Sequence, residues 1–308
     1  MKKLIAKLTI LIFLLLILVG VVEFLSLNPA TKEKIAVLTN SEDFLEGDTS
    51  DVDQVILSAR ADDGSKVLVL GDSIARQMFS VMGPDVPNGH IACTYAAINI
   101  SGQYMIAMEY LETHPEATDI WLFAHPLTIT RTYDLEQGYG YAVMPFAKEG
   151  SLRFLDDETI DKMASVYGRL AMIGTVADLI SESPINKKVF FSYIRLHREE
   201  YKQSNSYEIA SGLILRLRDE CEARGVKLHF YSSPSTEFYR EKIEETRGDY
   251  ELSALYEAYP DYLDSIYYFP TEWSDDLTHF DEEHANRETY ENIITGAYPE
   301  SVLCYNED

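Results

Sequence analysis

A buried strand that runs into a sharp turn constrains this chain more than any other feature of its sequence. Four apolar residues, Val67 to Leu70, are followed by Gly71-Asp72-Ser73 and then by a helix-compatible segment that starts at Ile74. A short unbroken apolar run of this kind is typical of a parallel strand covered on both faces. The pattern places Ser73 at a helix N-terminus. There its hydroxyl either caps the helix or, with a base nearby, acts as a nucleophile.

Strand and helix patterns alternate after this turn. Strands are predicted at 92–98, 120–124, 227–232 and 266–269, and helices at 103–113 and 207–224. Such alternation predicts an α/β fold, a three-layer α/β/α arrangement with a central parallel sheet. Ligand sites in these sheets lie beyond the carboxyl ends of the strands, which is where Ser73, Gly102 and His125 all fall.

An aspartate and a histidine, Asp276 and His279, lie three residues apart just before the last predicted helix. This spacing lets one turn present an imidazole while the carboxylate orients its far nitrogen, as a Ser-His-Asp triad requires. Together with Gly71-Asp72-Ser73, the motif resembles the SGNH/GDSL hydrolase superfamily over roughly residues 64 to 297. The resemblance implies a flavodoxin-like fold with Ser73 as nucleophile, His279 as base and Asp276 as the residue that orients the base.

The same resemblance implies an oxyanion hole. Its donors are the N–H groups of Ser73 and of Gly102, the latter in the run Asn99-Ile100-Ser101-Gly102. Where the family has a third donor, an asparagine after the third strand, this chain has His125. An imidazole can also donate a hydrogen bond. The alternatives are a glycine that eases a strand-to-helix turn and a histidine with a structural role.

Two further candidates have simpler explanations. Arg76, three residues after Ser73, either meets a substrate anion or is a solvated surface arginine. His284 lies in an acidic run, which lacks the His-Glu-x-x-His pattern of a metal site. Acidic residues at the first turn of a helix are explained by the helix dipole. The sequence therefore predicts no metal and no cofactor. The acidic run is Asp281, Glu282 and Glu283, and the imagined metal site would also use Asp275 and Asp276.

The N-terminus has the pattern of a signal anchor. Three lysines, Lys2, Lys3 and Lys7, precede an apolar run from Leu8 to Val22 in which Thr9 is the only polar residue. No small-x-small cleavage site and no lipobox cysteine follow. Residues 1–25 are therefore predicted to be one transmembrane helix, with the N-terminus in the cytoplasm and the rest of the chain outside.

The remaining chain divides into a stalk or lead-in at 26–63 and an SGNH-like domain at 64–300. Val55 to Ala59 can form a short helix within the lead-in. An insertion at about 127–205 is rich in tyrosines, which either stack on sugars or pack within the insertion. The net charge of −25 argues against nucleic acid and anionic lipid as partners. Three cysteines leave one disulfide or three buried thiols open.

Because His125 replaces the asparagine that the family has after the third strand, the chain is more similar to membrane-anchored, divergent members of the superfamily. These are the D-alanyl-transfer protein of teichoic acid synthesis and the O-acetyltransferase-like proteins of alginate and peptidoglycan. We therefore expect an extracytoplasmic serine esterase or O-acyltransferase, acting on acyl esters, foremost acetyl esters, of a cell-surface polysaccharide or wall polymer. Hydrolysis and transfer share one acyl-enzyme, so both stay open. The alternative is a non-catalytic SGNH-like scaffold, a partner of a multi-pass membrane O-acyltransferase.

Overall fold

The computed structural model describes residues 2–26, 50–79, 85–94, 98–129, 133, 138–182, 186, 189–190 and 203–298. Its N-terminal helix is α1 (Lys2–Ser26), and every side chain described in this helix is exposed. Among the helices in these ranges, none is both long and apolar enough to cross a membrane.

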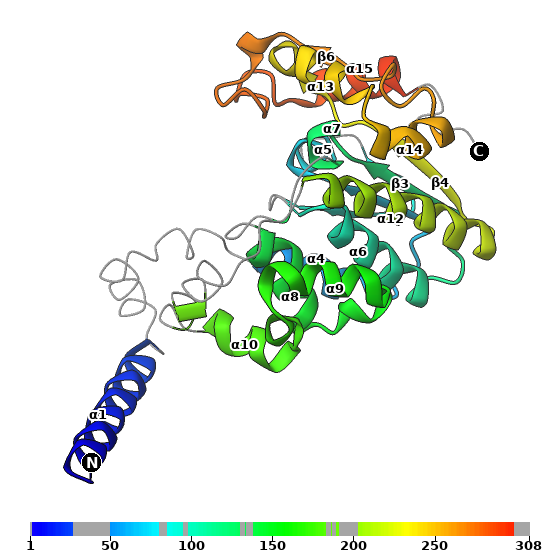
Figure 1. The fold of residues 1–308 in the computed structure, drawn as a ribbon. Coiled ribbons are helices and arrows are strands. Elements are labelled where there is room, and N and C mark those ends of the chain that lie inside the picture. Colours follow the sequence, from blue (N-terminus) through cyan, green and yellow to red (C-terminus); the bar gives the residue numbers. More distant parts are fainter. Residues whose placement is uncertain are drawn as a thin grey trace.

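Four parallel strands form the central sheet, in the order β2-β1-β3-β4. Of these, β3 and β4 are seen side by side in Figure 1. β1 (Val67–Gly71) lies between β2 (Gly89–Cys93) and β3 (Asp119–Phe123), and β4 (Lys227–Tyr231) pairs with β3. The α/β class and the parallel central sheet predicted from the sequence are confirmed. β2 starts before the predicted range 92–98, because Gly89 and His90 also join the ladder.

The strands end in register at one edge of the sheet. Gly71, the last residue of β1, pairs with Cys93 of β2 and with Phe123 of β3. The strand predicted at 266–269 does not extend this sheet. Instead, β6 (Tyr268–Phe269) pairs with β5 (Ser235–Thr236) in a separate two-stranded sheet.

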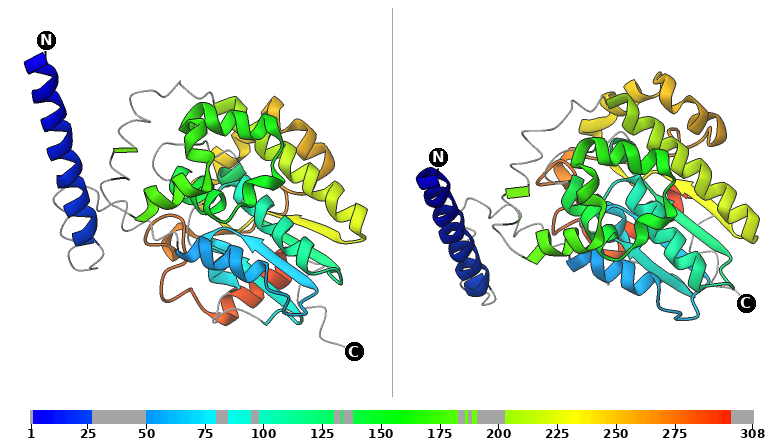
Figure 2. Two further views of the ribbon diagram at one scale, coloured as in Figure 1. Left: turned by 90° about the horizontal axis from the view of Figure 1, so that it is seen from below. Right: turned by 60° about the horizontal axis from the view of Figure 1, so that its bottom comes forward.

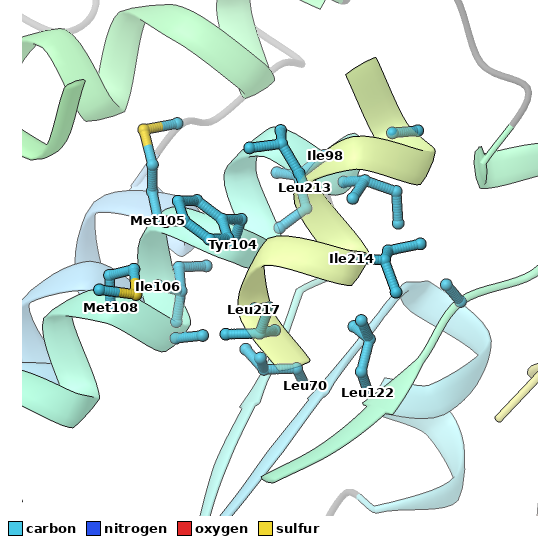
Figure 3. Close-up of a cluster of buried hydrophobic side chains, with 14 of the residues drawn as sticks. Leu70, Ile98, Tyr104, Met105, Ile106, Met108, Leu122, Leu213, Ile214 and Leu217 are labelled. Atoms are coloured by element: carbon cyan, nitrogen blue, oxygen red, sulfur yellow. The ribbon is translucent and has the colours of Figure 1, made fainter. Parts of the chain in front are cut away.

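Helices cover both faces of the central sheet. Leu68 and Leu70 of β1 belong to one buried cluster, and Val67 and Val69 belong to the other, as the two-residue period of a strand requires. The first cluster includes side chains of α4 (Ser50–Ala59), α6 (Ile100–Thr113) and α12 (Gln203–Arg224). Figure 3 shows Leu70 and Leu122 facing side chains of α6 and α12. The second cluster includes side chains of α5 (Ser73–Met78) and α15 (Arg287–Ala297), so α15 and α12 lie on opposite sides of the sheet (Figure 2).

Helix α4 belongs to the folded domain, although the predicted domain starts only at residue 64. Its apolar residues Val52, Val55, Ile56 and Ala59 follow the i, i+3, i+4, i+7 spacing of one helix face, and all four are buried. Residues 50–59 therefore form part of the core, not of the predicted lead-in that ended at residue 63. Of that lead-in, residues 27–49 lie outside the described part of the chain.

The predicted insertion at 127–205 is helical where it is described. Tyr133 and Tyr139 are both buried, and the Tyr139 hydroxyl donates to the Ala171 carbonyl at 3.0 Å. These two tyrosines therefore pack within the insertion and do not face a sugar. The insertion also contains a basic and aromatic stretch at 193–198, which lies outside the described residues. The helical segments are α7 (Pro126–Ile129), a π-helical turn (Gly138–Val143), α8 (Met144–Lys148), α9 (Asp157–Tyr167) and α10 (Gly174–Glu182), with short 3-10 turns at Ser151–Phe154 and Arg169–Met172.

Two short helices, α13 (Arg240–Thr246) and α14 (Ser253–Ala258), lie between β5 and β6. Short 3-10 turns lie at Glu237–Tyr239, Tyr250–Leu252 and Thr271–Trp273. Cys93 and Cys221 are buried free thiols, so neither takes part in the disulfide that the sequence left open. The third cysteine, Cys304, lies outside the described residues.

Candidate active site

The turn after β1 is built so that Ser73 opens a helix without capping it. A Cβ on Gly71 would come within 2.3 Å of the Ala75 Cβ, so this position admits only glycine. The N-cap of α5 is Asp72, whose Oδ1 accepts the N–H groups of Ile74 and Ala75, each at 3.1 Å. Because Asp72 takes the capping role, the hydroxyl of the half-buried Ser73 is left for another partner.

The Asp72 carboxylate also joins the ends of three strands. Its Oδ2 accepts the backbone N–H of His125 at 3.1 Å, just after β3. Its Oδ1 accepts the hydroxyl of Ser233 at 2.9 Å, just after β4. Asp72 is buried, and hydrogen bonds to a buried carboxylate are stronger than those between neutral groups. One side chain thus fixes the serine turn, the His125 segment and the end of β4 against one another.

Ser73, His279 and Asp276 form one chain of hydrogen bonds. The Ser73 Oγ lies 2.7 Å from His279 Nε2, and His279 Nδ1 lies 2.6 Å from Asp276 Oδ2. A carboxylate can only accept, so His279 Nδ1 carries the proton that it donates to Asp276. In the neutral imidazole, Nε2 is then the acceptor for the Ser73 hydroxyl. The structure brings together the three residues that the sequence singled out as a triad, although Asp276 and His279 are partly open to solvent.

The loop that carries the histidine is shaped by Asp276 itself. Asp276 Oδ1 accepts the N–H groups of Thr278 at 2.8 Å and of His279 at 2.7 Å. Burial alone would raise the pKa of the Asp276 carboxyl, but the bonds from His279 and Thr278 outweigh it and lower this pKa to about 2. Asp276 is therefore ionised at neutral pH. Between these residues Leu277 has a φ of 67°, in the left-handed region that side chains rarely adopt.

A cavity of about 200 Å³ opens beside Ser73. It is smaller than the pockets that hold drug-sized ligands, which span roughly 300 to 1,000 Å³. In the part of the chain that the structure describes, the only ionisable side chains along this cavity are Asp72, His125 and Tyr239. The cavity therefore suits a small, uncharged group. It is lined by Asp72, Ser73, Ile74, Ile98, His125, Leu127, Thr128, Ser235, Thr236, Tyr239, Leu277 and Thr278.

His125, one of the three predicted oxyanion donors, lines this cavity together with Ser73. Burial lowers the pKa of His125, and the nearby Asp72 carboxylate opposes this effect only in part, so the imidazole is neutral at pH 7. Its Nδ1 accepts the N–H of Leu127 at 3.2 Å. The ring proton then resides on Nε2, which makes His125 a neutral hydrogen-bond donor at the cavity.

Gly102 does not reach the cavity, so the prediction of an oxyanion donor there is wrong. Its N–H donates to Asn99 Oδ1 at 3.3 Å, because Asn99 is the N-cap of α6. The glycine is buried, and a Cβ on it would lie 3.0 Å from the Phe146 ring. Its small size serves packing between α6 and α8.

Arg76 does not line the cavity either, which corrects its prediction as a substrate-binding residue. One of its Nη atoms pairs with Asp51 Oδ1 at 2.7 Å and donates to the Cys93 carbonyl at 3.0 Å. The guanidinium thus ties α5 to α4 and to the end of β2. A structural role of this kind was not foreseen from the sequence.

The acidic run around His284 forms a local pair. His284 Nδ1 lies 2.8 Å from Asp281 Oδ1, and the imidazole stacks on Trp273 with ring centres 4.4 Å apart. Across the described ranges, no group of three or more histidine, cysteine, aspartate or glutamate residues has an arrangement that could hold a metal ion.

Two residues at the site were missed by sequence reasoning. Gln77 exchanges two hydrogen bonds with the backbone of Phe280, the residue after His279. Thr236 donates its hydroxyl to the Leu277 carbonyl at 2.8 Å. The only signal for Gln77 was its spacing of one helical turn from Ser73, and no pattern marked Thr236.

Comparison with protein-family models, curated proteins and solved structures gave no match. What the site can do is therefore inferred from its own geometry.

Proposed function

We propose that this protein is a serine esterase or O-acyltransferase that works through an acyl-enzyme. The observation behind the proposal is the hydrogen-bonded chain from Ser73 through His279 to Asp276, at the mouth of a small, mostly apolar cavity. A serine within hydrogen-bond reach of a histidine, which a third group orients, is the usual arrangement of an activated nucleophile.

The first half-reaction follows from these contacts. His279 Nε2 takes the hydroxyl proton of Ser73 while Oγ attacks the acyl carbon of an ester, and the carbonyl π electrons move to its oxygen. The tetrahedral intermediate then collapses and expels the alcohol oxygen, which takes the proton back from Nε2. Asp276 stays ionised and stabilises the imidazolium between these two transfers. The product is an ester of Ser73.

The oxyanion has two donors in this scheme. The N–H of Ser73 belongs to the first turn of α5, whose donors have no partner within the helix, and Asp72 takes only those of Ile74 and Ala75. The second donor is His125 Nε2–H. Two such groups, fixed in place before the reaction, stabilise the transition state by about 3 kcal/mol each. Water as the second acceptor gives an esterase, and a glycan hydroxyl gives a transferase.

We propose membership of the SGNH/GDSL superfamily on the same grounds. In its support, the serine follows the central strand β1, the Asp-x-x-His loop precedes the last described helix α15, and helices lie on both faces of a parallel sheet. His125 in place of asparagine and the absence of Gly102 from the cavity are the two departures from the family pattern.

The cavity favours an acetyl ester over a D-alanyl ester. A D-alanyl group would bring an ammonium ion, which requires a free carboxylate nearby. Among the described residues, Asp72 is the only carboxylate that lines the cavity, and both of its oxygens already accept hydrogen bonds. We therefore propose O-acetyl groups on a surface polysaccharide or wall polymer as the substrate class.

We propose that the N-terminus holds the chain at the membrane with the α/β domain outside. The support comes from the three basic residues before the run Leu8 to Val22 and from the exposure of the apolar side chains described in α1. This run is shorter than the roughly 20 residues of a typical span. Insertion would therefore need Lys7 to extend its ammonium toward the membrane surface. Retention of the full chain in a carbonate-washed membrane pellet, and its release on deletion of residues 2–26, would test this.

The catalytic proposal is tested by fluorophosphonate labelling of the full chain in mild detergent. We expect wild type to label, Ser73→Ala to lose the label, and His279→Ala to label only at a slow residual rate, because only an activated serine reacts readily. Ser165→Ala, which removes an exposed hydroxyl on α9, is the matched control and should label like wild type. No labelling of a folded wild-type chain would refute the enzyme and favour a binding scaffold.

A further inference from the structure

The glutamine one turn after the candidate nucleophile holds the loop of the candidate base. Gln77 Nε2 donates to the Phe280 carbonyl, and Gln77 Oε1 accepts the Phe280 N–H, each at 3.1 Å. Phe280 directly follows His279 in the chain. Both polar atoms of one side chain are thus used on a single backbone unit next to the imidazole.

Residues on either side of His279 are held by different means. Before it, the Leu277 carbonyl accepts the hydroxyl of Thr236. After it, the Phe280 ring is buried and stacks on Phe269, with ring centres 4.1 Å apart. The ring contact keeps residue 280 against the core but leaves the direction of its peptide groups to hydrogen bonds. Gln77 supplies both bonds to the Phe280 backbone, and together with the bond from the Asp281 N–H to the Trp273 carbonyl at 2.9 Å it sets the direction of the chain after His279.

Gln77 lies four residues after Ser73, on the same helix as the candidate nucleophile. Residues i and i+4 of a helix lie on the same face, so Ser73 and Gln77 point to the same side of α5. One short helix therefore carries the serine and also the side chain that locates its hydrogen-bond partner. Any tilt of α5 would move both together and preserve the 2.7 Å separation of Ser73 Oγ and His279 Nε2.

We propose that Gln77 is a positioning residue that keeps His279 in reach of Ser73. This deepens the proposed function and rests on it, since Gln77 acts only through His279 and does not line the cavity. Catalytic groups must be held close to the productive geometry, and a misplacement of about 1 Å can reduce the rate about 100-fold.

The test compares rates of fluorophosphonate labelling in the full chain. Gln77→Leu removes both hydrogen bonds at similar side-chain volume, and we expect a rate about 10- to 100-fold below wild type. Gln77→Glu keeps an acceptor for the Phe280 N–H but cannot donate to its carbonyl when ionised, so an intermediate rate is expected. Gln54→Leu, an exposed glutamine on α4, is the matched control.

A double-mutant cycle separates positioning from a general effect on the fold. In the His279→Ala background, Gln77→Leu should change the residual rate by less than about 2-fold, because the group through which it acts is gone. An equal loss in both backgrounds would overturn the proposal. So would a wild-type rate in Gln77→Leu.

Proton NMR of His279 provides a readout that does not need catalysis. The Nδ1 proton in the 2.6 Å bond to Asp276 should give a downfield resonance that disappears in His279→Ala. We expect Gln77→Leu to weaken or shift it. If wild type does not label, the catalytic function fails, and this resonance alone decides about Gln77. An unchanged resonance in Gln77→Leu would then refute the positioning role.

Discussion

Replacing Asp72 by asparagine tests whether one buried carboxylate holds the strand ends together. Its Oδ1 accepts Ile74 N–H, Ala75 N–H and the Ser233 hydroxyl, and its Oδ2 accepts His125 N–H. In Asp72→Asn the amide oxygen can accept hydrogen bonds from the three donors that contact Oδ1 in wild type. The amide NH₂ must then face the N–H of His125, donor against donor.

The expected loss in the free energy of unfolding follows from this mismatch of two facing donors. A hydrogen bond to a charged group contributes about 1.5 to 3 kcal/mol, and an unsatisfied buried N–H costs about 1 to 3 kcal/mol. Because the two effects overlap, we expect a loss of about 3 kcal/mol in the free energy of unfolding. For a domain of this size the melting temperature should fall by about 6 to 12 °C.

The assay is thermal unfolding of the full chain in detergent, followed by tryptophan fluorescence. Asp178→Asn, at an exposed position of α10, controls for the change of charge and should melt like wild type. A melting temperature of Asp72→Asn within about 2 °C of wild type would refute the idea that this carboxylate secures three strand ends.

Two further predictions concern other buried ionisable groups. Glu109 is buried between Arg60 and Arg153, with oxygen to nitrogen distances of 2.8 and 2.9 Å, so Glu109→Gln should cost about 3 to 5 kcal/mol in urea unfolding; a loss below about 1 kcal/mol would contradict this. His125 has a lowered pKa in the folded state, so below the ordinary value of 6.5 the unfolded chain binds more protons, and stability should fall as the pH drops. His125→Gln should flatten this slope, and an unchanged pH dependence of unfolding would show that another group causes it.

Local sequence patterns correctly predicted the structural features that depend only on residues close together in the chain. The apolar run before Gly71 fixed β1 and the position of Ser73, and the spacing of Asp276 and His279 predicted their pairing. Both depend on backbone geometry over a few residues. The meeting of Ser73 with His279 could be inferred only through a family resemblance, since nothing in either motif states that they touch.

The misplaced predictions share a physical cause. Gly102 was expected at the cavity because the run Asn99-Ile100-Ser101-Gly102 resembles the family's oxyanion block, but Asn99 caps α6 and accepts the Gly102 N–H. Arg76 was expected to bind a substrate anion, but its guanidinium pairs with Asp51 of α4 at 2.7 Å. Competition between hydrogen-bond partners decided both cases: the nearby N-cap Asn99 for Gly102, and Asp51 on the separate helix α4 for Arg76. A single sequence does not reveal which partner wins.

The wide separation of the serine and the histidine also affects when the site can form during synthesis. Ser73 and His279 are 206 positions apart, and the helix α15 that packs behind β1 comes later still. A nascent chain therefore makes Ser73 206 positions before His279, so the Ser73–His279 hydrogen bond cannot form while the strands and helices between them emerge. If the site works through the proposed acyl-enzyme, a nascent chain that lacks His279 has no base beside Ser73, so acylation has to wait for the loop that carries His279.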